Sequence, residues 1–226
     1  MTKQPAAYYR PDNLAEALRL LQQPDTVPLA GGTKLLAADI TVAVVDLQDL
    51  GLNQVQGEAG RRHFGATMTL AEISAVLAEE EEAGPAALLR QAIQQAGPNT
   101  YRNAATLGGT IASRLPDSEL LAALLVLDVT LSLYATAYTS EPEQISLVDY
   151  LAGTERPFGL ITAIHIPWQN GRFASERVAR TPADYPIVSV TMWQPADAAP
   201  CLAATGITPL PVRLTAAEAA LVAGDR

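Results

Sequence analysis

Cysteine is almost absent from this chain, which has a single one, Cys201, in 226 residues. One cysteine excludes an intrachain disulfide and any zinc or iron–sulfur site built from four cysteines of the same chain. The two histidines, His63 and His165, have no ligand-type residues near them in the sequence, and we interpret them as ordinary strand or surface residues. Redox chemistry would therefore need a bound organic cofactor, with any metal centres on other chains.

Positive charge is also scarce. The chain has 15 lysines and arginines against 24 aspartates and glutamates, which gives a formal net charge of −9. A protein that binds nucleic acid needs a basic face to neutralise phosphates, so we exclude nucleic acid as a partner. The acidic balance does not exclude an anion held by backbone amides, which need no charged side chain.

Long apolar runs are missing as well. No run approaches the roughly 20 residues of a transmembrane helix, and the segment from Met1 to Pro11 lacks the basic stretch and apolar core of a secretory signal. We therefore expect no membrane span and a cytoplasmic location. Apolar residues make up 49% of the chain and charged residues 17%, a composition typical of a globular protein with a real core.

Hydrophobic spacing predicts mixed helices and strands up to residue 134. The sequences Asn13-Leu-Ala-Glu16 and Thr69-Leu-Ala-Glu72 both resemble capping boxes, and each predicts the start of a helix. Further helices are expected from Pro85 to a stop at Gly97, and from a cap at Asp117 to Leu127. Strands are expected over residues 27–30, 41–47, 63–66 and 129–134.

The pattern changes after Gly153. Strands are expected over residues 160–166 and 187–193, and a short final helix is expected from Thr215. The irregular order of helices and strands along the whole chain predicts an α+β fold rather than a regular doubly wound sheet. We place a domain boundary within residues 155–170.

Two glycine-bearing segments stand apart from the packing pattern. The first is Leu29-Ala-Gly-Gly-Thr-Lys34, and the second is Arg102-Asn-Ala-Ala-Thr-Leu-Gly-Gly-Thr110. Paired glycines permit positive φ angles and let the backbone approach a ligand closely, and successive amides in such a turn can form an anion nest. Two facing loops of this kind would supply the several donors that a dinucleotide pyrophosphate needs.

Each glycine pair alone is more often a tight turn than a phosphate site. Neither segment matches the Gly-x-x-x-x-Gly-Lys-Ser/Thr loop or the Gly-x-Gly-x-x-Gly fingerprint. The residues by themselves leave two interpretations open, namely tight turns and a site for an anion or nucleotide.

The order of the motifs resembles that of the FAD-binding medium subunit of the xanthine dehydrogenase and carbon monoxide dehydrogenase family. Ala30-Gly-Gly-Thr33 and the later Arg102-Asn103-x-x-Thr106-Leu107-Gly108-Gly109 carry the resemblance. It extends over nearly the whole chain through Val45-Asp46-Leu47, Gly65-Ala66-x-x-Thr69-Leu70-x-Glu72-Ile73, Leu120-Leu121-x-Ala123-Leu124-Leu125-x-Leu127-Asp128, Asp184-x-x-Ile187-Val188, and Pro211-Val212-Arg213 with Glu218.

This resemblance implies a two-part FAD-binding domain (PCMH-like) in residues 1–160. A small, shortened C-terminal α/β flavoprotein domain would follow in residues 161–226. It also implies contacts with the pyrophosphate and, at Glu119, with the ribityl chain or ring edge of the flavin. The residues so assigned are Ala30, Gly31, Gly32, Thr33, Lys34, Thr106, Gly108, Gly109, Thr110 and Glu119.

The implied function is that of an oxidoreductase flavoprotein subunit in a molybdenum hydroxylase complex. Electrons would pass from a partner 2Fe–2S subunit through FAD to NAD or another acceptor. A molybdenum-cofactor subunit would be the second partner, and a homodimer of the whole complex is compatible with this assignment.

Departures from the family pattern motivate other interpretations. Lys34 replaces an Asp or amide-like residue, while Thr110 and Ser113 replace asparagines. A scaffold subunit that keeps the fold without FAD is therefore one alternative. A free-standing flavin oxidoreductase is another, although no catalytic acid or base can be named for it.

Overall fold

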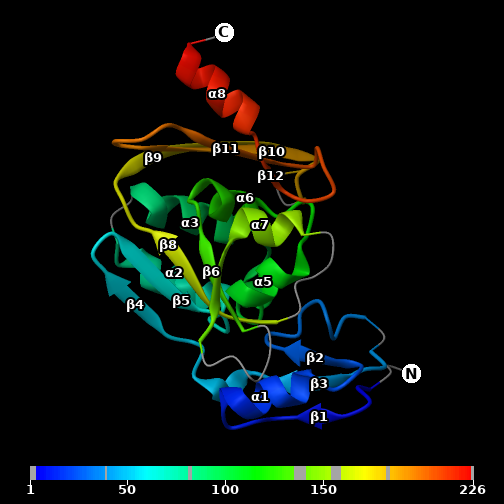
Figure 1. The fold of residues 1–226 in the computed structure, drawn as a ribbon. Helices are drawn as coiled ribbons and strands as arrows, with labels where there is room; N and C mark the ends of the chain where they lie inside the picture. The colour runs from blue at the N-terminus through cyan, green and yellow to red at the C-terminus, as the bar shows by residue number, and fades with distance from the viewer. Residues whose placement is uncertain are drawn as a thin grey trace.

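Three separate sheets follow one another from the N-terminal to the C-terminal end of the molecule (Figure 1). The computed structural model describes residues 4–38, 40–80, 83–134, 141–153, 159–181 and 184–224. The first sheet is parallel, and the middle and last sheets are antiparallel. Helices and strands in this irregular order confirm the α+β fold. None of the helices formed by the described residues has the length and apolar character that crossing a membrane requires.

The first sheet has the strand order β1-β3-β2, with α1 packed against it. Asn13 begins the helix as predicted, because its side-chain oxygen accepts a hydrogen bond from the amide of Glu16 at 2.9 Å. Ala17 and Leu18 pack with Val45 in a small core. The bounds are β1 (Tyr8–Tyr9), α1 (Leu14–Leu21), β2 (Thr26–Leu29) and β3 (Ala43–Asp46), followed by a short 3₁₀ helix, η1 (Gln48–Leu50).

The middle sheet has the order β4-β5-β8-β6-β7 and supports most of the helices. The capping box predicted at Thr69 is confirmed in full, since Thr69 and Glu72 exchange side-chain and backbone hydrogen bonds. The strands are β4 (Val55–Glu58), β5 (Arg61–Gly65), β6 (Thr130–Tyr134), β7 (Glu143–Ser146) and β8 (Leu160–Pro167). The helices are α2 (Leu70–Ala78), α3 (Gly84–Gln95), α4 (Asn99–Arg102), α5 (Leu107–Ser113), α6 (Glu119–Val126) and α7 (Leu147–Ala152).

Helix α6 lies in the centre of the molecule, and every one of its eight residues is buried. A helix that is apolar on all sides is stable only when it is covered on all sides, and α6 packs against α3, α7 and the last sheet. The prediction of Asp117 as its cap was wrong by one residue. Ser118 is the cap, and its hydroxyl accepts from the amide of Leu121 at 3.2 Å.

The last sheet has the order β12-β11-β10-β9 and continues into α8. An Arg213–Glu218 pair joins β12 to α8, and Arg213 also donates to the carbonyl of Leu125 in α6 at 3.1 Å. The bounds are β9 (Gly171–Val178), β10 (Val188–Pro195), β11 (Cys201–Thr205), β12 (Val212–Arg213) and α8 (Thr215–Ala223). β8 pairs within the middle sheet, so the chain enters the last sheet only at Gly171, and the division near residue 160 stays a prediction.

The two histidines lie opposite each other on β5 and β8, a pairing that their sequence separation concealed. Their Nδ1 atoms are hydrogen bonded, and His165 Nε2 lies 2.6 Å from the hydroxyl of Ser132. Burial lowers the pKa of His165 below 6.5, and the charges of His63 and Arg61 act in the same direction. The histidines are thus strand residues, as predicted, but each has a polar partner.

Stability should fall on acidification because of His165. Its folded pKa lies below the unfolded value of 6.5, so its contribution is complete above that pH and is lost as the pH falls toward the folded pKa. We expect denaturant unfolding to show a smaller loss of stability between about pH 7.5 and about pH 5.5 for His165→Gln than for the wild type. Parallel pH profiles for the two proteins would contradict this assignment.

Candidate functional site

The first glycine segment follows the end of β2 and turns sharply. Gly32 adopts a φ of 68°, a left-handed conformation that glycine accepts without strain. The amide of Leu36 donates to the carbonyl of Gly32 at 2.8 Å and closes the turn. Of the four glycines in the two segments, only Gly32 uses the positive φ that the paired glycines suggested.

The two glycine segments meet at Gly31. A Cβ atom added to Gly31 would lie 1.7 Å from the carbonyl oxygen of Ala104, far inside any permitted contact. The backbone that follows β2 therefore touches the backbone that precedes α5. The two segments thus face each other at this contact. The contact also joins the first sheet to the helices of the middle sheet.

The second segment is the start of a helix rather than a loop. Thr106 caps α5, and its hydroxyl accepts from the amide of Gly109 at 3.1 Å. The amide of Gly108 donates to the carbonyl of Ala66 at 2.9 Å. A Cβ on Gly108 would come within 2.8 Å of Ala66, so this glycine is needed for packing. A Cβ on Gly109 would meet only the Thr106 hydroxyl, so Gly109 remains open to solvent.

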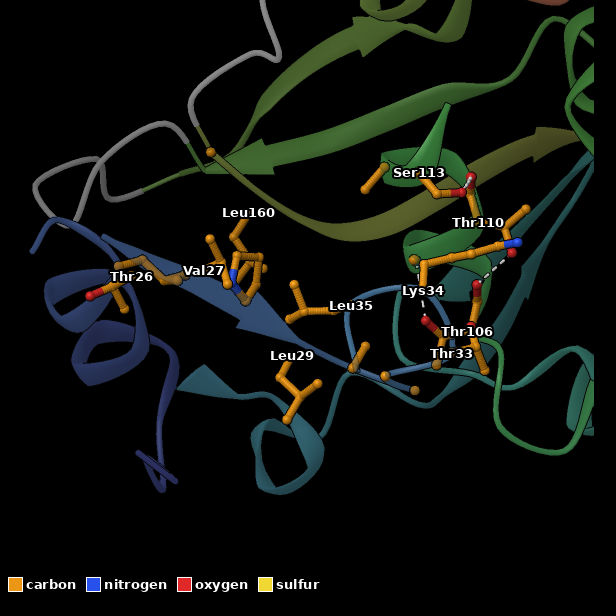
Figure 2. Close-up of a pocket in the computed structure, with 18 of the residues that line it drawn as sticks. Thr26, Val27, Leu29, Thr33, Lys34, Leu35, Thr106, Thr110, Ser113 and Leu160 are labelled. Atoms are coloured by element: carbon orange, nitrogen blue, oxygen red, sulfur yellow. Dashed lines mark hydrogen bonds between the residues drawn. The ribbon is translucent and has the colours of Figure 1, made fainter. Parts of the chain in front are cut away.

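Both segments line one cavity of about 560 Å³ between the first and middle sheets (Figure 2). This volume falls within the range of small-molecule and cofactor sites. Among the described residues that line it, Lys34 is the only charged one. Figure 2 shows the Lys34 side chain extending toward Thr106 and Thr110 at the start of α5.

The polar end of the cavity offers backbone donors. In the described part of the chain, no acceptor is found for the amides of residues 31–34. Successive amides that are partly open to solvent and have no partner can act together as donors to an anion. The hydroxyls that replace the family's asparagines are already used: Thr110 donates to the Thr106 carbonyl at 2.9 Å, and Ser113 donates to the Thr110 carbonyl at 2.8 Å.

Tyr101 closes the same end of the cavity. The Nζ atom of Lys34 lies 5.7 Å from the centre of its ring, within the range of a cation–π contact. Burial raises the pKa of Tyr101, and interactions with the side chains of Thr33 and Thr110 act in the opposite direction. The tyrosine is therefore a neutral hydroxyl at ordinary pH, beside the lysine.

The cavity gathers eight of the ten predicted site residues. They are Ala30, Gly31, Gly32, Thr33, Lys34, Thr106, Gly109 and Thr110. Gly108 lies behind the wall against Ala66. Glu119 is buried at the start of α6, where its carboxylate faces Arg177 of β9 at 3.5 Å.

The apolar end of the cavity has no counterpart among the predicted site residues. It is formed mainly by Leu18, Leu21, Val27, Leu29, Tyr134 and Leu160. The spacing of Leu18 and Leu21 in α1 signals a buried face, but not that this face borders a cavity. Leu160 and Tyr134 come from the middle sheet, so only the fold brings them together. The cavity thus has one polar end and one apolar end.

Comparison with known proteins agrees with this geometry. Residues 3–169 match the family model described as FAD binding domain in molybdopterin dehydrogenase. Protein YgfM of Escherichia coli K12 is 33% identical over 192 residues, covering 82% of this chain and 68% of that protein. The glyceraldehyde dehydrogenase medium chain of Sulfolobus acidocaldarius is 28% identical over 200 residues, with the same two coverages.

Solved structures share the fold. Carbon monoxide dehydrogenase from Hydrogenophaga pseudoflava superposes with a TM-score of 0.84 at 20% identity, covering 97% of this chain and 81% of that one. Quinoline 2-oxidoreductase from Pseudomonas putida 86 gives 0.81 at 20% identity, covering 94% and 78%. The chain belongs to the family of FAD-binding domains in molybdopterin dehydrogenases. It is accordingly an FAD-binding oxidoreductase flavoprotein of the molybdenum hydroxylase type.

Replacing Gly31 by alanine should separate the two glycine segments. The new Cβ would collide with the Ala104 carbonyl, which is backbone and cannot rotate away. We expect a loss of about 3 kcal/mol in the free energy of unfolding, the upper end of what overpacking usually costs. Gly57→Ala is the matched control, because its Cβ meets only the flexible end of Arg62. Equal stability of the two variants would contradict the close contact.

Proposed function

We propose that this chain binds FAD in the cavity between its first two sheets, with the pyrophosphate at the open amides of residues 31–34. The observation that carries the proposal is the row of amides of residues 31–34, which have no acceptor among the described residues and lie beside Lys34, the one charged side chain among the described lining residues. Thr33, Thr106, Gly109 and Thr110 complete the polar wall. The leucines and tyrosines of the apolar end would enclose a ring of the cofactor away from water.

Because the chain is acidic overall, Lys34 would be needed to offset the charge of the pyrophosphate. The protein as a whole repels anions, with a formal charge of −9. A dinucleotide pyrophosphate carries two negative charges, which four backbone amides and one ammonium group can offset locally. The hydroxyls of Thr110 and Ser113 donate within α5, so they contribute no donor to the pyrophosphate. Lys34 and the amides would thus take over the role of the missing asparagines.

FAD, when bound, accepts and releases electrons singly or in pairs, and the chain supplies its position and surroundings. We propose that the chain is the electron-transfer subunit of a molybdenum hydroxylase complex, with a 2Fe–2S subunit and a molybdenum-cofactor subunit as partners. NAD or another acceptor would take the electrons. The medium chain of a glyceraldehyde dehydrogenase among its relatives supports this role. The single cysteine also requires that an iron–sulfur cluster with four cysteine ligands belong to another chain.

We propose that the chain consists of two domains. Residues 1–160 would form the FAD-binding domain, and residues 161–226 would form a smaller domain that closes one side of it. Support comes from the last sheet, which shares no strand with the middle sheet in the described residues. Strand β8 (Leu160–Pro167) pairs with β5 and β6, so the first residues of the second part are built into the sheet of the first.

The visible absorption spectrum of the purified chain, before and after incubation with FAD, tests the cofactor. We expect flavin bands that remain after gel filtration, and release of FAD rather than FMN on denaturation. A colourless protein that takes up no FAD, yet still assembles with its partner subunits, would contradict the proposal and favour a flavin-free scaffold. Turnover of a small substrate by the isolated chain would instead favour a free-standing flavin enzyme.

The two glycines of α5 should respond differently to substitution. Gly108→Val would collide with Ala66 and lower stability by about 1–3 kcal/mol. Gly109→Val would place a side chain in the cavity, and its Cβ would displace only the Thr106 hydroxyl, which lies 2.8 Å away. We expect this second variant to fold and to lose FAD, as measured by circular dichroism and the 450-nm flavin absorbance. Full FAD content in folded Gly109→Val would contradict the proposed position of the cofactor.

A further inference from the structure

Strand β9 forms an open edge of the last sheet. It lies at the end of the strand order β12-β11-β10-β9 and, among the described residues, pairs with β10 alone. β9 has eight residues, whereas the opposite edge strand, β12, has two. Its pairing with β10 shows no register shift, and its sequence contains no proline. A long and regular edge of this kind, without a bulge or a proline, is suited to the addition of a further strand.

Alternate residues of β9 turn their backbone groups toward this open edge. In an antiparallel pair, residues that bond to the neighbouring strand alternate with residues that point away from it. The carbonyl of Asn170 accepts from the amide of Ala196 at 3.0 Å, and at the other end the carbonyl of Val178 accepts from Ile187 at 2.8 Å. The even-numbered residues of β9 therefore bond to β10. The outward residues are Gly171, Phe173, Ser175 and Arg177.

The exposed face of β9 carries one positive and one negative side chain. Arg172 and Glu176 are both exposed, and they lie two residues before and two residues after Ala174. A strand rises about 3.3 Å per residue, so their Cα atoms are about 13 Å apart along one chain. Opposite charges thus lie at equal distances from the midpoint of the strand, an arrangement that is complementary to itself after a two-fold rotation.

We propose that two copies of this chain pair through β9, antiparallel and with the two-fold axis at Ala174, so that their last sheets form one continuous sheet. Arg172 then lies opposite Glu176 of the second copy. This pair is of the non-hydrogen-bonded kind, in which the side chains approach most closely. Because the contact is isologous, the same ion pair forms on both sides of the axis. The interface is separate from the cavity, and the inference does not depend on FAD.

The outward backbone groups select the same register. With the axis at Ala174, Gly171 lies opposite Arg177 of the second copy and Phe173 lies opposite Ser175, so every outward amide and carbonyl gains a partner. A shift by one residue would set outward residues against residues already bonded to β10. A shift by two residues would leave one outward residue of each copy beyond the partner strand and would separate the opposite charges. Backbone and charge, two independent features of β9, therefore agree on a second copy as the partner.

Sedimentation of the full chain over a range of concentrations tests the ion pairs. The wild type should sediment as a dimer that dissociates on dilution. Arg172→Glu and Glu176→Arg should each weaken the dimer at least about tenfold, because each sets like charges opposite each other on both sides of the axis. The double variant Arg172→Glu/Glu176→Arg should again form the dimer as tightly as the wild type, since opposite charges face each other once more.

Arg19→Glu is the matched control for these charge reversals. Arg19 is an exposed residue of α1, which lies at the other end of the molecule from β9 (Figure 1). The substitution changes the net charge by the same amount as Arg172→Glu and should leave the dimer unchanged.

Ser175→Pro tests the backbone contribution to the dimer. Proline removes an amide that points to the open edge, a position at which edge strands tolerate it. The variant should keep the circular dichroism of the wild type and sediment as a monomer. Ser175→Ala is its control, because it also removes the hydroxyl that lies 3.1 Å from that of Thr191 but keeps the amide. If Ser175→Pro fails to fold, the charge variants decide.

Three outcomes would overturn the proposal. The first is a wild type that stays monomeric at the highest soluble concentration. The second is a dimer that the single charge reversals and Ser175→Pro leave intact, because its interface would then lie elsewhere. The third is a monomer that binds a different protein through β9, shown by loss of that complex in Ser175→Pro and not in Ser175→Ala.

Discussion

The contact between the backbone at Gly31 and the carbonyl of Ala104 is the constraint on which the site depends. Two segments separated by more than seventy residues meet where no side chain fits, since even a Cβ would lie 1.7 Å from the carbonyl oxygen. This contact sets the position of the small parallel sheet against the antiparallel one. The cavity opens beside this contact, and both segments line it.

Hydrogen bonds and helix packing elsewhere in the molecule hold the two segments of this contact in place. The hydrogen bonds of Leu107 to Met68 and of Gly108 to Ala66 attach the start of α5 to the segment that leaves β5. Helix α6 fills the space between the middle and last sheets and is buried along its whole length. Its first turn carries Glu119 to a place where the last sheet can reach it. Packing of an apolar helix thereby places its first turn against Arg177 of the C-terminal sheet.

Sequence patterns predicted the elements well and the site only in part. Capping chemistry is local, so the signals at Asn13 and Thr69 gave the correct starts of α1 and α2. The glycine pairs indicated where two backbones approach, but not that Gly108 serves packing while Gly109 faces the cavity. That distinction depends on Ala66, a neighbour that only the fold supplies. The His63–His165 pair and the Glu119–Arg177 pair were likewise beyond any local pattern, because each joins strands or helices far apart in the chain.

Amide hydrogen exchange with and without FAD tests the central claim, that the free amides of the first glycine segment hold the cofactor. In the free protein these amides have no acceptor among the described residues, so they should exchange rapidly. We expect FAD to protect residues 31–34 strongly, and to protect Gly109 less because its amide already donates to Thr106. Tight binding of FAD that leaves residues 31–34 in rapid exchange would place the pyrophosphate elsewhere and contradict the account.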